Sequence, residues 1–494
     1  MELRRYVMLA LLGVLVIAAA VYLYGQGDGG DGAEARKVIS DYDPMVDLEV
    51  VFRIDRIRML DVERGASPLF GMDITIDGQT IEGVGPWGGI DAHPRWRHVQ
   101  DVDDSEENVS ITVRLYTIDG DEQTDMDISP GHGAGRGQTL HLVYSLKTGR
   151  WTGDDWLHDP SGMGHVSGAE DGSLDDHDCE LWFSIYQTDA DHDRLTWYEE
   201  TYIYGTDPAV DDTGSDMDGD GVPIGWEDTW GYSPLRADNH STLDPDMDGI
   251  QNDEEYRMAF YGADPFRQDV FVEVDYMENQ FFGHTTLPEY SKQMVISAFA
   301  RHDIMLHVDD GLMGGGGEIL PFEKFYTPEK LAAYYDQYFL HGGSEAWRQD
   351  VFRYAVMAYY TMEGRRNVAG YSYWPDRDDQ FNCFVVARRA IKNYRWTPMS
   401  RDTATASLFM HELGHTLGLF WHTYHGIDNT TNIYPWLSGW SIYENYRSCM
   451  NYRYAWSHVD YSDGSHGEGD FDDWSHVDPA FFEKPFFAEP PIIL

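Results

Sequence analysis

Lysine and cysteine are both scarce in this chain of 494 residues. Its three cysteines, Cys179, Cys383 and Cys449, exclude a disulfide framework and leave either one Cys383–Cys449 bridge or free buried thiols. Only seven lysines contribute to the 35 basic residues, which stand against 86 acidic ones, and the formal net charge is −51. Because such a chain would repel phosphates, we expect no nucleic-acid partner.

The acidic residues are spread along the chain rather than gathered in one tail. Most of this charge is expected on a solvated surface of the kind that suits a salty environment, and some aspartate clusters have the pattern of calcium sites. A hydrophobic content of 42% and an aromatic content of 14% are typical of folded domains. At this length, two to four domains are expected.

A long apolar run stands near the first residue. It extends over 19 residues from Tyr6 to Tyr24, behind Arg4 and Arg5, and a helix of ~20 such residues crosses a bilayer. The alternative is a cleaved signal peptide, whose apolar run is usually shorter, ~7–15 residues. The run predicts a transmembrane anchor over 1–25 and a linker over 26–39. The arginines predict a cytoplasmic N-terminus, hence a single-pass protein of the cell membrane with its catalytic domain outside the cell.

Residues 40–187 have the pattern of strands. Apolar residues alternate with polar ones in several stretches, such as Leu48 to Ile54 and Val109 to Leu115, and Gly/Asp-rich turns separate them. Period-two alternation indicates strands with one buried face, so an antiparallel β-sandwich is predicted. With its Asp-rich loops at 101–104 and 175–178, the layout faintly resembles a C2-like domain. A plain sandwich with polar loops is the alternative.

Residues 188–266 contain an internal repeat of acidic loops. Each of two copies has acids at positions one, three and five, glycine at six and glutamate at twelve, which is the spacing of a calcium loop. These acids are Asp216, Asp218, Asp220 and Glu227 in one copy, and Asp244, Asp246, Asp248 and Glu255 in the next. A weaker copy, with Asp189, Asp191, Asp193 and Glu200, has Arg194 in place of the glycine.

Similar tails follow the three loops, each containing glycine and then proline: 204–208, 231–234 and 261–265. The arrangement resembles thrombospondin type 3-like or EF-hand-like calcium repeats. That resemblance implies a stiff connector braced by Ca²⁺ rather than a calcium sensor.

Strands and helices are predicted to alternate from Asp269 onward. Strands are expected at 270–274, 304–308 and 353–360, and helices at 288–301 and 328–339. An α/β subdomain therefore precedes the next motif.

The motif His411-Glu412-Leu413-Gly414-His415 is the strongest chemical signal in the chain. Residues four apart lie on one face of a helix, so His411 and His415 can bind one zinc ion, beside which the Glu412 carboxylate can take a proton from water. We expect this helix to begin near Asp402 and to end at Gly418.

Three more residues extend the motif: His422 after the glycine, and Met450 and Tyr452 in Ser448-Cys449-Met450-Asn451-Tyr452. The whole resembles metzincin-type zinc metallopeptidases, whose motif is H-E-x-x-H-x-x-G-x-x-H followed by a Met-turn. The resemblance implies a methionine floor from Met450 and an oxyanion contact from Tyr452. One departure is that Trp421 stands where the third ligand belongs. His422, one residue later, is the predicted ligand, with His425 and, more distantly, Asp428 as alternatives.

These patterns predict a multidomain fold. It comprises an N-terminal transmembrane helix, an antiparallel β-sandwich, a calcium-loop repeat connector and, over 267–494, an α/β metzincin-like catalytic domain. The predicted function is a membrane-anchored extracellular zinc metalloendopeptidase that acts on proteins or peptides, with Zn²⁺ and Ca²⁺ as cofactors and Glu412 as general base. The alternative is a calcium-binding surface or adhesion protein with an inactive peptidase-like domain. A self-processing or sheddase-like role is a further possibility.

Overall fold

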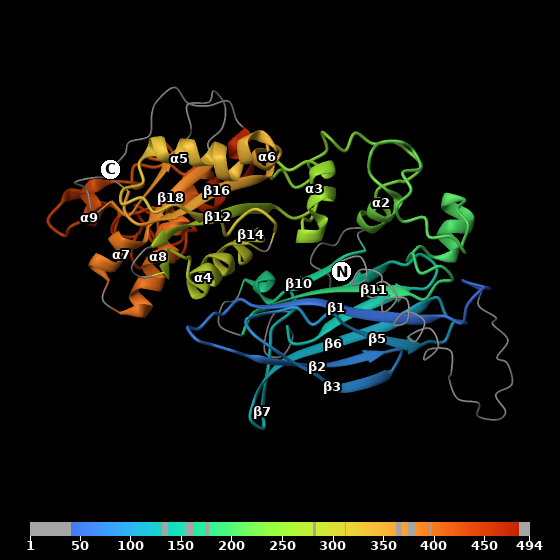
Figure 1. The fold of residues 1–494 in the computed structure, drawn as a ribbon. Coiled ribbons are helices and arrows are strands. Elements are labelled where there is room, and N and C mark those ends of the chain that lie inside the picture. The colour runs from blue at the N-terminus through green and yellow to red at the C-terminus, as the bar shows by residue number, and fades with distance from the viewer. Residues whose placement is uncertain are drawn as a thin grey trace, which may run out of the picture. The chain divides into compact units, whose positions relative to one another are not determined.

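The structure, a computed structural model, describes residues 41–130, 137–154, 162–172, 177–279, 283–311, 313–361, 368–373, 382–395 and 397–483 (Figure 1). The predicted anchor over 1–25 and the linker over 26–39 lie outside these residues. Within the residues described, no helix has both the length and the apolar character that a membrane crossing needs.

The fold class predicted from the sequence is therefore wrong, and so is the membrane location that depended on it. The described chain is built mainly on three β-sheets, and its helices are short or amphipathic rather than membrane-spanning. The anchor was predicted from one apolar run and the two arginines before it, and such a run reports residue type rather than structure.

Two antiparallel sheets form the first part of the described chain (Figure 1). One has the order β10-β11-β1-β4, with β5 also paired to β1, and the other the order β3-β2-β6-β8-β9, with β7 paired to β6. The bounds are β1 Glu49–Met59, β2 Leu69–Ile76, β3 Gln79–Gly88, β4 Asp91–Ala92, β5 Trp96–Asp101, β6 Asn108–Asp119, β7 Glu122–Asp125, β8 Leu140–Ser145, β9 Trp151–Gly153, β10 Gly164–Ser167 and β11 Cys179–Gln187.

The alternating side chains explain this packing. Val50, Phe52 and Ile54 of β1 are fully buried. Ile111 and Val113 of β6 are fully buried too, and the β6 residues on either side of each are more exposed. Side chains from both sheets belong to one hydrophobic core. Burying one face of each sheet removes apolar surface from water, which is the main force that holds two sheets together.

The connector carries two short helices, α2 Ile224–Trp230 and α3 Asn252–Met258. Each follows directly on one acidic loop and contains the glutamate at position twelve of that loop, Glu227 in α2 and Glu255 in α3. Val222, Trp226 and Trp230 form a small hydrophobic core at the first complete loop, which runs from Asp216 to Glu227. Each loop therefore continues into a helix, and that helix fixes the position of the glutamate at the end of the loop.

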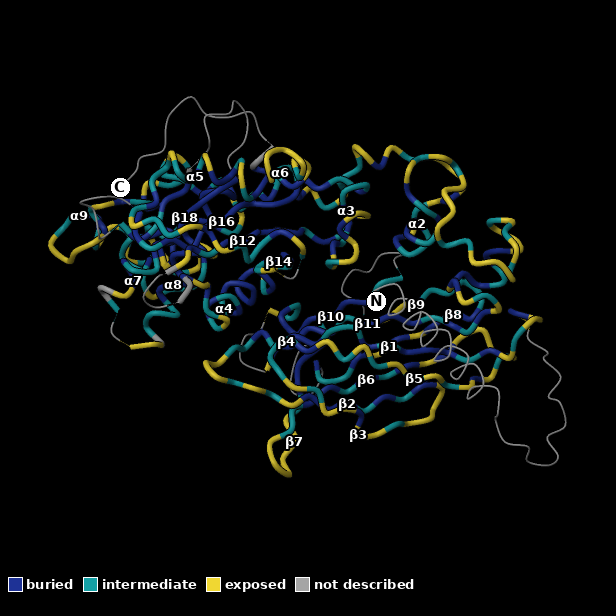
Figure 2. The backbone as a smooth tube through the Cα atoms, viewed as in Figure 1, coloured by how far each residue is buried: buried dark blue, intermediate teal, exposed yellow. Residues whose placement is uncertain are grey.

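A mixed sheet forms the centre of the third part. Its order is β13-β12-β16-β18-β17, and β14 and β15 also pair with β12. The bounds are β12 Asp269–Asn279, β13 Gly283–His284, β14 Met305–Asp309, β15 Ile319–Leu320, β16 Phe352–Ala358, β17 Gly370–Tyr373 and β18 Cys383–Ala387. Strands β12, β16 and β18 are parallel and buried (Figure 2), as expected of strands covered on both faces.

Helices α4 Glu289–Ala300, α5 Pro328–Tyr334, α6 Arg348–Val351, α7 Arg388–Tyr394, α8 Pro398–Thr416 and α9 Ser438–Ile442 accompany this sheet. Single turns of 3₁₀ or π type occur at Gly168–Asp171, Glu199–Tyr204, Ala259–Tyr261, Tyr335–Phe339, His341–Gly343, Thr430–Asn432, Trp474–His476 and Pro479–Glu483. Cys179, Cys383 and Cys449 are all buried free thiols, so the bridge left open by the sequence is not formed.

Helix α8 begins earlier than the sequence indicates. The Thr397 hydroxyl accepts a hydrogen bond from the Ser400 N–H and Pro398 occupies the first turn, which together start the helix. Asp402, the predicted cap, instead pairs with Arg64 at 2.9 Å. The helix ends as predicted before Gly418, whose φ of 89° suits glycine.

A buried ionic cluster joins the first sheet to the third part of the chain. Glu180 of β11 accepts from Arg58 of β1 at 2.6 Å and from Arg267 at 3.1 Å, and all three side chains are buried. Arg267 also donates to Asp303 at 2.7 Å. Burial raises the pKa of Glu180, but Arg58, His165 and Arg267 outweigh it and hold that pKa well below its usual range.

We predict that Glu180→Gln destabilises the fold by about 3 kcal/mol at pH 7, because it leaves the buried Arg58 without a countercharge and removes one of the two acids bonded to Arg267. A carboxylate whose pKa is depressed on folding stabilises the fold above its unfolded pKa of about 4.3, and this stabilisation is lost as the pH falls below it. The difference in the free energy of unfolding between the wild-type protein and Glu180→Gln should therefore be smaller at low pH than at pH 7. Urea unfolding at pH 7 and at low pH measures both effects.

The matched control is Asp253→Asn, which breaks the exposed pair with Arg257 (3.2 Å) and should change stability by under about 0.5 kcal/mol. Equal stability of the Glu180→Gln and Asp253→Asn variants at pH 7 would contradict the account of the cluster.

Candidate metal centre

Helix α8 presents His411, Glu412 and His415 in the interior of the protein. The two imidazoles have ring centroids 5.0 Å apart and are only 4% and 8% exposed. Positions four apart bring side chains to one face of a helix, so this proximity follows directly from the sequence.

Main-chain carbonyls fix the orientation of both rings. Nδ1 of His411 lies 2.8 Å from the Cys449 carbonyl oxygen, and Nδ1 of His415 lies 2.7 Å from that of Leu419. A carbonyl only accepts, so each Nδ1 must carry a proton, and in the neutral form of each ring it is Nε2 that offers a lone pair. Metal-binding histidines in proteins are usually oriented this way.

Asp428 completes the group. Its Oδ1 lies 3.1 Å from Nε2 of His411 and its Oδ2 3.4 Å from Nε2 of His415. One ligand atom from each of these three residues lies within 4.8 Å of the others. His422 and His425 are exposed instead, and His425 packs on the Trp421 ring. The structure thus brings Asp428 to the histidine pair in the place predicted for His422.

The loop after α8 explains the difference. Leu419 is still buried after the turn at Gly418, but residues 420–425 are half-buried or exposed, and the chain returns to the interior at Gly426 and Ile427. The Asp428 N–H then donates to the Met450 carbonyl at 3.2 Å, and its φ of 54° is a left-handed value that aspartate tolerates. This return is set by packing far along the chain, so the local spacing from Gly418 does not reveal it.

The Met-turn lies directly beneath the helix. Met450 is fully buried, and a Cβ at Gly414 would lie 2.8 Å from its Sδ and 2.9 Å from the Tyr461 hydroxyl. Carbonyls of this turn hold two of the three candidate ligands, since Cys449 accepts from His411 and Met450 accepts from Asp428. Met450 therefore lies where the predicted floor requires it.

Tyr452 and Glu412 border the same group. The Tyr452 ring stacks on His411 with centroids 5.8 Å apart, and its hydroxyl donates to the Asp428 carboxylate. Glu412 Oε2 accepts from the Ser372 hydroxyl at 2.9 Å, and Oε1 lies where a Cβ at Gly370 would be. Both partners of Glu412 belong to β17, and sequence reasoning missed them because no local motif marks that strand.

The charged groups of the site shift one another's pKa values. Burial raises the pKa of Glu412 to about 7, against the opposing effects of His411 and Ser372. Burial lowers the pKa of His411, but the adjacent Asp428 carboxylate outweighs it and raises that pKa to about 9. Burial also lowers the pKa of His415. Burial acts to raise the pKa of Asp428, yet the two histidines hold it below its usual range.

In each of the two complete acidic loops, the first aspartate accepts hydrogen bonds from backbone N–H groups of the same loop. In the first, Asp216 accepts from the N–H groups of Gly219 and Gly221. In the second, Asp244 accepts from those of Asp248 and Gly249. Both carboxylate oxygens of Glu227 and of Glu255 are buried and have no hydrogen-bond partner among the described residues.

The weaker copy adopts the same form without its glycine. Arg194 has a φ of 75° at the position where Gly221 and Gly249 have φ of 100° and 92°. Asp193 and Glu200 are buried, and burial together with neighbouring aspartates raises the pKa of Glu200 to about 8.

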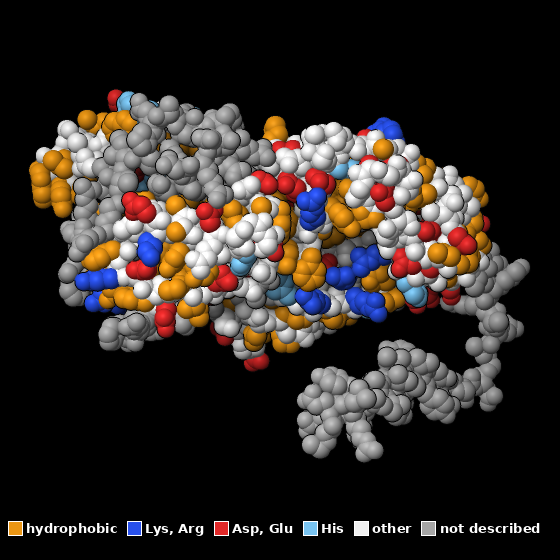
Figure 3. All heavy atoms as spheres, turned by 45° about the horizontal axis from the view of Figure 1, so that its top comes forward, with side chains coloured by type: hydrophobic (Ala, Val, Ile, Leu, Met, Phe, Trp, Pro, Cys, Tyr) orange, Lys and Arg blue, Asp and Glu red, His pale blue; other side chains and the backbone are white. Residues whose placement is uncertain are grey.

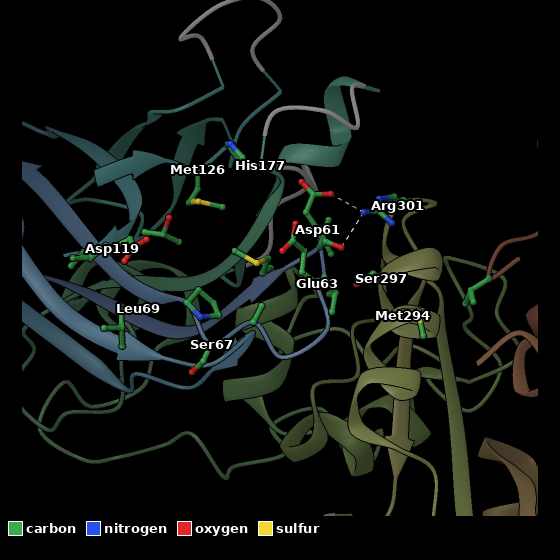
Figure 4. Close-up of a pocket in the computed structure, with 18 of the residues that line it drawn as sticks. Asp61, Glu63, Ser67, Leu69, Asp119, Met126, His177, Met294, Ser297 and Arg301 are labelled. Carbon is green, nitrogen blue, oxygen red and sulfur yellow. Dashed lines mark hydrogen bonds and ion pairs between the residues drawn. The ribbon is translucent and has the colours of Figure 1, made fainter. Parts of the chain in front are cut away.

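A separate pocket lies between the first sheet and helix α4. Asp61, Glu63, Ser297 and Arg301 line it, and Arg301 bonds the Asp61 carboxylate at 3.0 Å (Figure 4). Its lining does not include the group around His411. On the face shown in Figure 3, acidic side chains are scattered rather than gathered in one patch.

Comparison with known proteins gives no family for the chain. No known family matches it, and no curated protein matches it. Among solved structures, a C2 domain is similar with a TM-score of 0.18 and 6% identity over 28% of this chain and 98% of that one. A C2 domain of plant extended synaptotagmin 1 has a TM-score of 0.17 and 12% identity over 29% of this chain and 95% of that one.

Human GIVD cytosolic phospholipase A2, in complex with methyl gamma-linolenyl fluorophosphonate, has a TM-score of 0.15 and 9% identity over 30% of this chain and 18% of that one. Similarities with TM-scores this low carry no argument for the fold or the function of this chain.

We predict that Gly414→Ala destabilises the protein by about 1–2 kcal/mol, although alanine normally favours a helix over glycine. The added methyl group would meet Met450 and Tyr461 at less than contact distance. Thermal unfolding measures the effect. In a Met450→Ala background the same substitution should cost less, and an equal cost in both backgrounds would show that the Met-turn does not lie against Gly414.

Proposed function

We propose that the chain is a zinc-dependent metalloendopeptidase that hydrolyses peptide bonds in proteins or peptides. The observation that supports this most directly is the convergence of His411, His415 and Asp428, with Glu412 beside them on the same helix. Catalytic zinc in proteins has three protein ligands and one open position. Two imidazoles and one carboxylate are a known set of donors for it.

The residues present fit zinc in their chemistry. The Nε2 atoms of His411 and His415 lie 3.1 and 3.4 Å from the two oxygens of the Asp428 carboxylate, so the ligand atoms of all three side chains face the same space. A divalent cation would satisfy all three at once. In this proposal Asp428 replaces His422 as the third ligand.

When bound, zinc supplies a Lewis acid that polarises the scissile carbonyl and lowers the pKa of a bound water. In this proposal Glu412 is the group that transfers a proton from the attacking water to the leaving amine. Ser372 holds Oε2 of Glu412 at 2.9 Å, which leaves Oε1 to accept a proton from the attacking water and to pass it to the leaving amine. Burial raises the pKa of Glu412 to about 7, a value suited to a base that later acts as an acid.

Tyr452 positions the third ligand in this account. Its hydroxyl bonds Asp428 and its ring stacks on His411. The oxyanion contact predicted from the sequence would require this hydroxyl to turn toward the substrate.

Strand β17 offers a place for the substrate. It ends the described order of the sheet, and among the described strands it pairs with β18, in antiparallel fashion. Gly370 and Ser372 place this strand beside Glu412. An extended peptide that adds to the edge of β17 would bring its own amide bond toward Glu412.

The proposal includes Ca²⁺ in the connector. Glu227 and Glu255 are buried acids whose oxygens lack hydrogen-bond partners among the described residues, and each ends a loop with the spacing of a calcium site. A buried carboxylate that no hydrogen bond satisfies keeps its charge only beside a cation, and otherwise takes up a proton. We infer one ion in each complete loop.

We predict that Glu412→Gln retains one bound zinc and lowers kcat for casein hydrolysis by about 10²–10⁴-fold, because the amide keeps the shape of the side chain but accepts no proton. Zinc content by elemental analysis and hydrolysis by fluorescence give the two readings. Full activity in this variant would exclude Glu412 as the base and favour a different catalytic group.

A second prediction compares the two candidate third ligands. Asp428→Ala should lower zinc content from about one ion per chain to near zero, because two imidazoles alone hold zinc weakly. The matched control His422→Ala removes an exposed imidazole and should keep the ion. The opposite ranking of the two variants would restore His422 as the ligand.

A further inference from the structure

A fourth aspartate follows the three aspartates of each acidic loop and binds the loop through its backbone N–H. The position-five acid accepts a hydrogen bond from the N–H of another aspartate in every copy: Asp193 from Asp212 (3.2 Å), Asp220 from Asp238 (3.0 Å) and Asp248 from Asp269 (2.6 Å). Each of these aspartates stands four residues after the proline of its tail (212 minus 208, 238 minus 234 and 269 minus 265). The repeat is therefore longer than its calcium loop.

The last of the three differs from the others in its surroundings. Asp212 and Asp238 are half-buried in the connector, but Asp269 is 1% exposed and is the first residue of β12. Its Oδ1 lies 2.5 Å from Nε2 of His307, a residue of the adjacent strand β14, and its Oδ2 accepts from the Asp264 N–H at 2.8 Å. Asp269 thus belongs at once to the repeat and to the central sheet.

Four acids converge at this junction. Asp246, Asp248, Glu255 and Asp269 are near enough for each of the first three to be affected by the charge of Asp269. Both oxygens of Glu255, which is 1% exposed, have no hydrogen-bond partner among the described residues. The nearby cation Arg267 is already bonded to Glu180 and Asp303. Glu255 therefore offers two buried oxygens that no hydrogen bond from the described residues satisfies, beside three further acids.

We propose that Asp269 is part of the second calcium site, so that one Ca²⁺ joins the connector to β12 of the catalytic sheet. The ion is held by Asp244, Asp246, Asp248 and Glu255, and Asp269 supplies a further charge and fixes Asp248 through its N–H. This inference rests on the calcium part of the proposed function and not on the zinc chemistry.

The geometry implies a specific effect of the ion. The first part of β12 pairs with β14 from Asp269 to Glu273 and with β16 from Phe271 to Tyr276, and β16 pairs in turn with β18. An ion at the first residue of β12 would stabilise the start of that strand against opening. Calcium bound in the first complete loop, whose extra aspartate Asp238 lies outside any strand, would have no such effect.

The test is hydrogen exchange of the full chain with and without Ca²⁺, together with calorimetric calcium binding. We expect Ca²⁺ to slow exchange of the β12 amides by at least about tenfold in the wild-type protein. Asp269→Asn should lower calcium affinity at one site by about tenfold, since ligand charge tunes calcium affinity, and should abolish the slowing. The control Asp238→Asn should weaken the other site and keep the slowing in β12.

Each outcome has a separate meaning. Calcium binding that leaves β12 exchange unchanged in the wild-type protein overturns the inference while the calcium connector stands, and this arm needs no variant to fold. Unchanged calcium affinity in Asp269→Asn overturns it as well. Absence of calcium binding in the wild-type protein overturns the calcium connector itself, and the zinc peptidase proposal is untouched by any of these results.

Discussion

The hydrogen bonds from the two imidazoles to the main chain are the constraint on which the candidate site depends. With each Nδ1–H held by a carbonyl, both Nε2 lone pairs must point into the same small space. One of these carbonyls belongs to Cys449 in the Met-turn, so the turn orients His411 as well as packing under the helix. Met450 then binds the N–H of Asp428. A single turn thus fixes one histidine and the carboxylate between the two.

Buried carboxylates are a second feature that recurs in the structure. Where an arginine faces one, as Arg58 and Arg267 face Glu180, the charges satisfy each other within the protein. Where no described side chain bonds to it, as with Glu255, the carboxylate keeps its charge only beside an external cation and otherwise takes up a proton. This contrast explains why so acidic a chain can bury acids at the junctions between its parts. It also links the connector to β12, with which β13, β14, β15 and β16 of the mixed sheet pair.

Local patterns predicted what depends on local geometry. The positions of His411 and His415 follow from the period of a helix, and the strands around Val50 and Ile111 follow from alternation. Asp428 was placed behind His422 and His425 because an irregular loop with a long-range bond to Met450 brings it to the two histidines. Ser372 was missed because no local motif marks β17, the strand that brings it to Glu412. Asp269 had a signal in the spacing from each tail proline, but its meaning required the backbone bonds. The apolar run at 6–24 indicated a membrane helix that no described part of the structure supports.

The central claim is that His411, His415 and Asp428 bind one metal ion. Anomalous diffraction at the zinc absorption edge, from crystals of the zinc-loaded chain, tests it most directly. The account predicts one strong peak about 2.0–2.2 Å from Nε2 of each histidine and from a carboxylate oxygen of Asp428. A peak bound by His422 or His425 in place of Asp428, or no peak at the histidine pair, would contradict it.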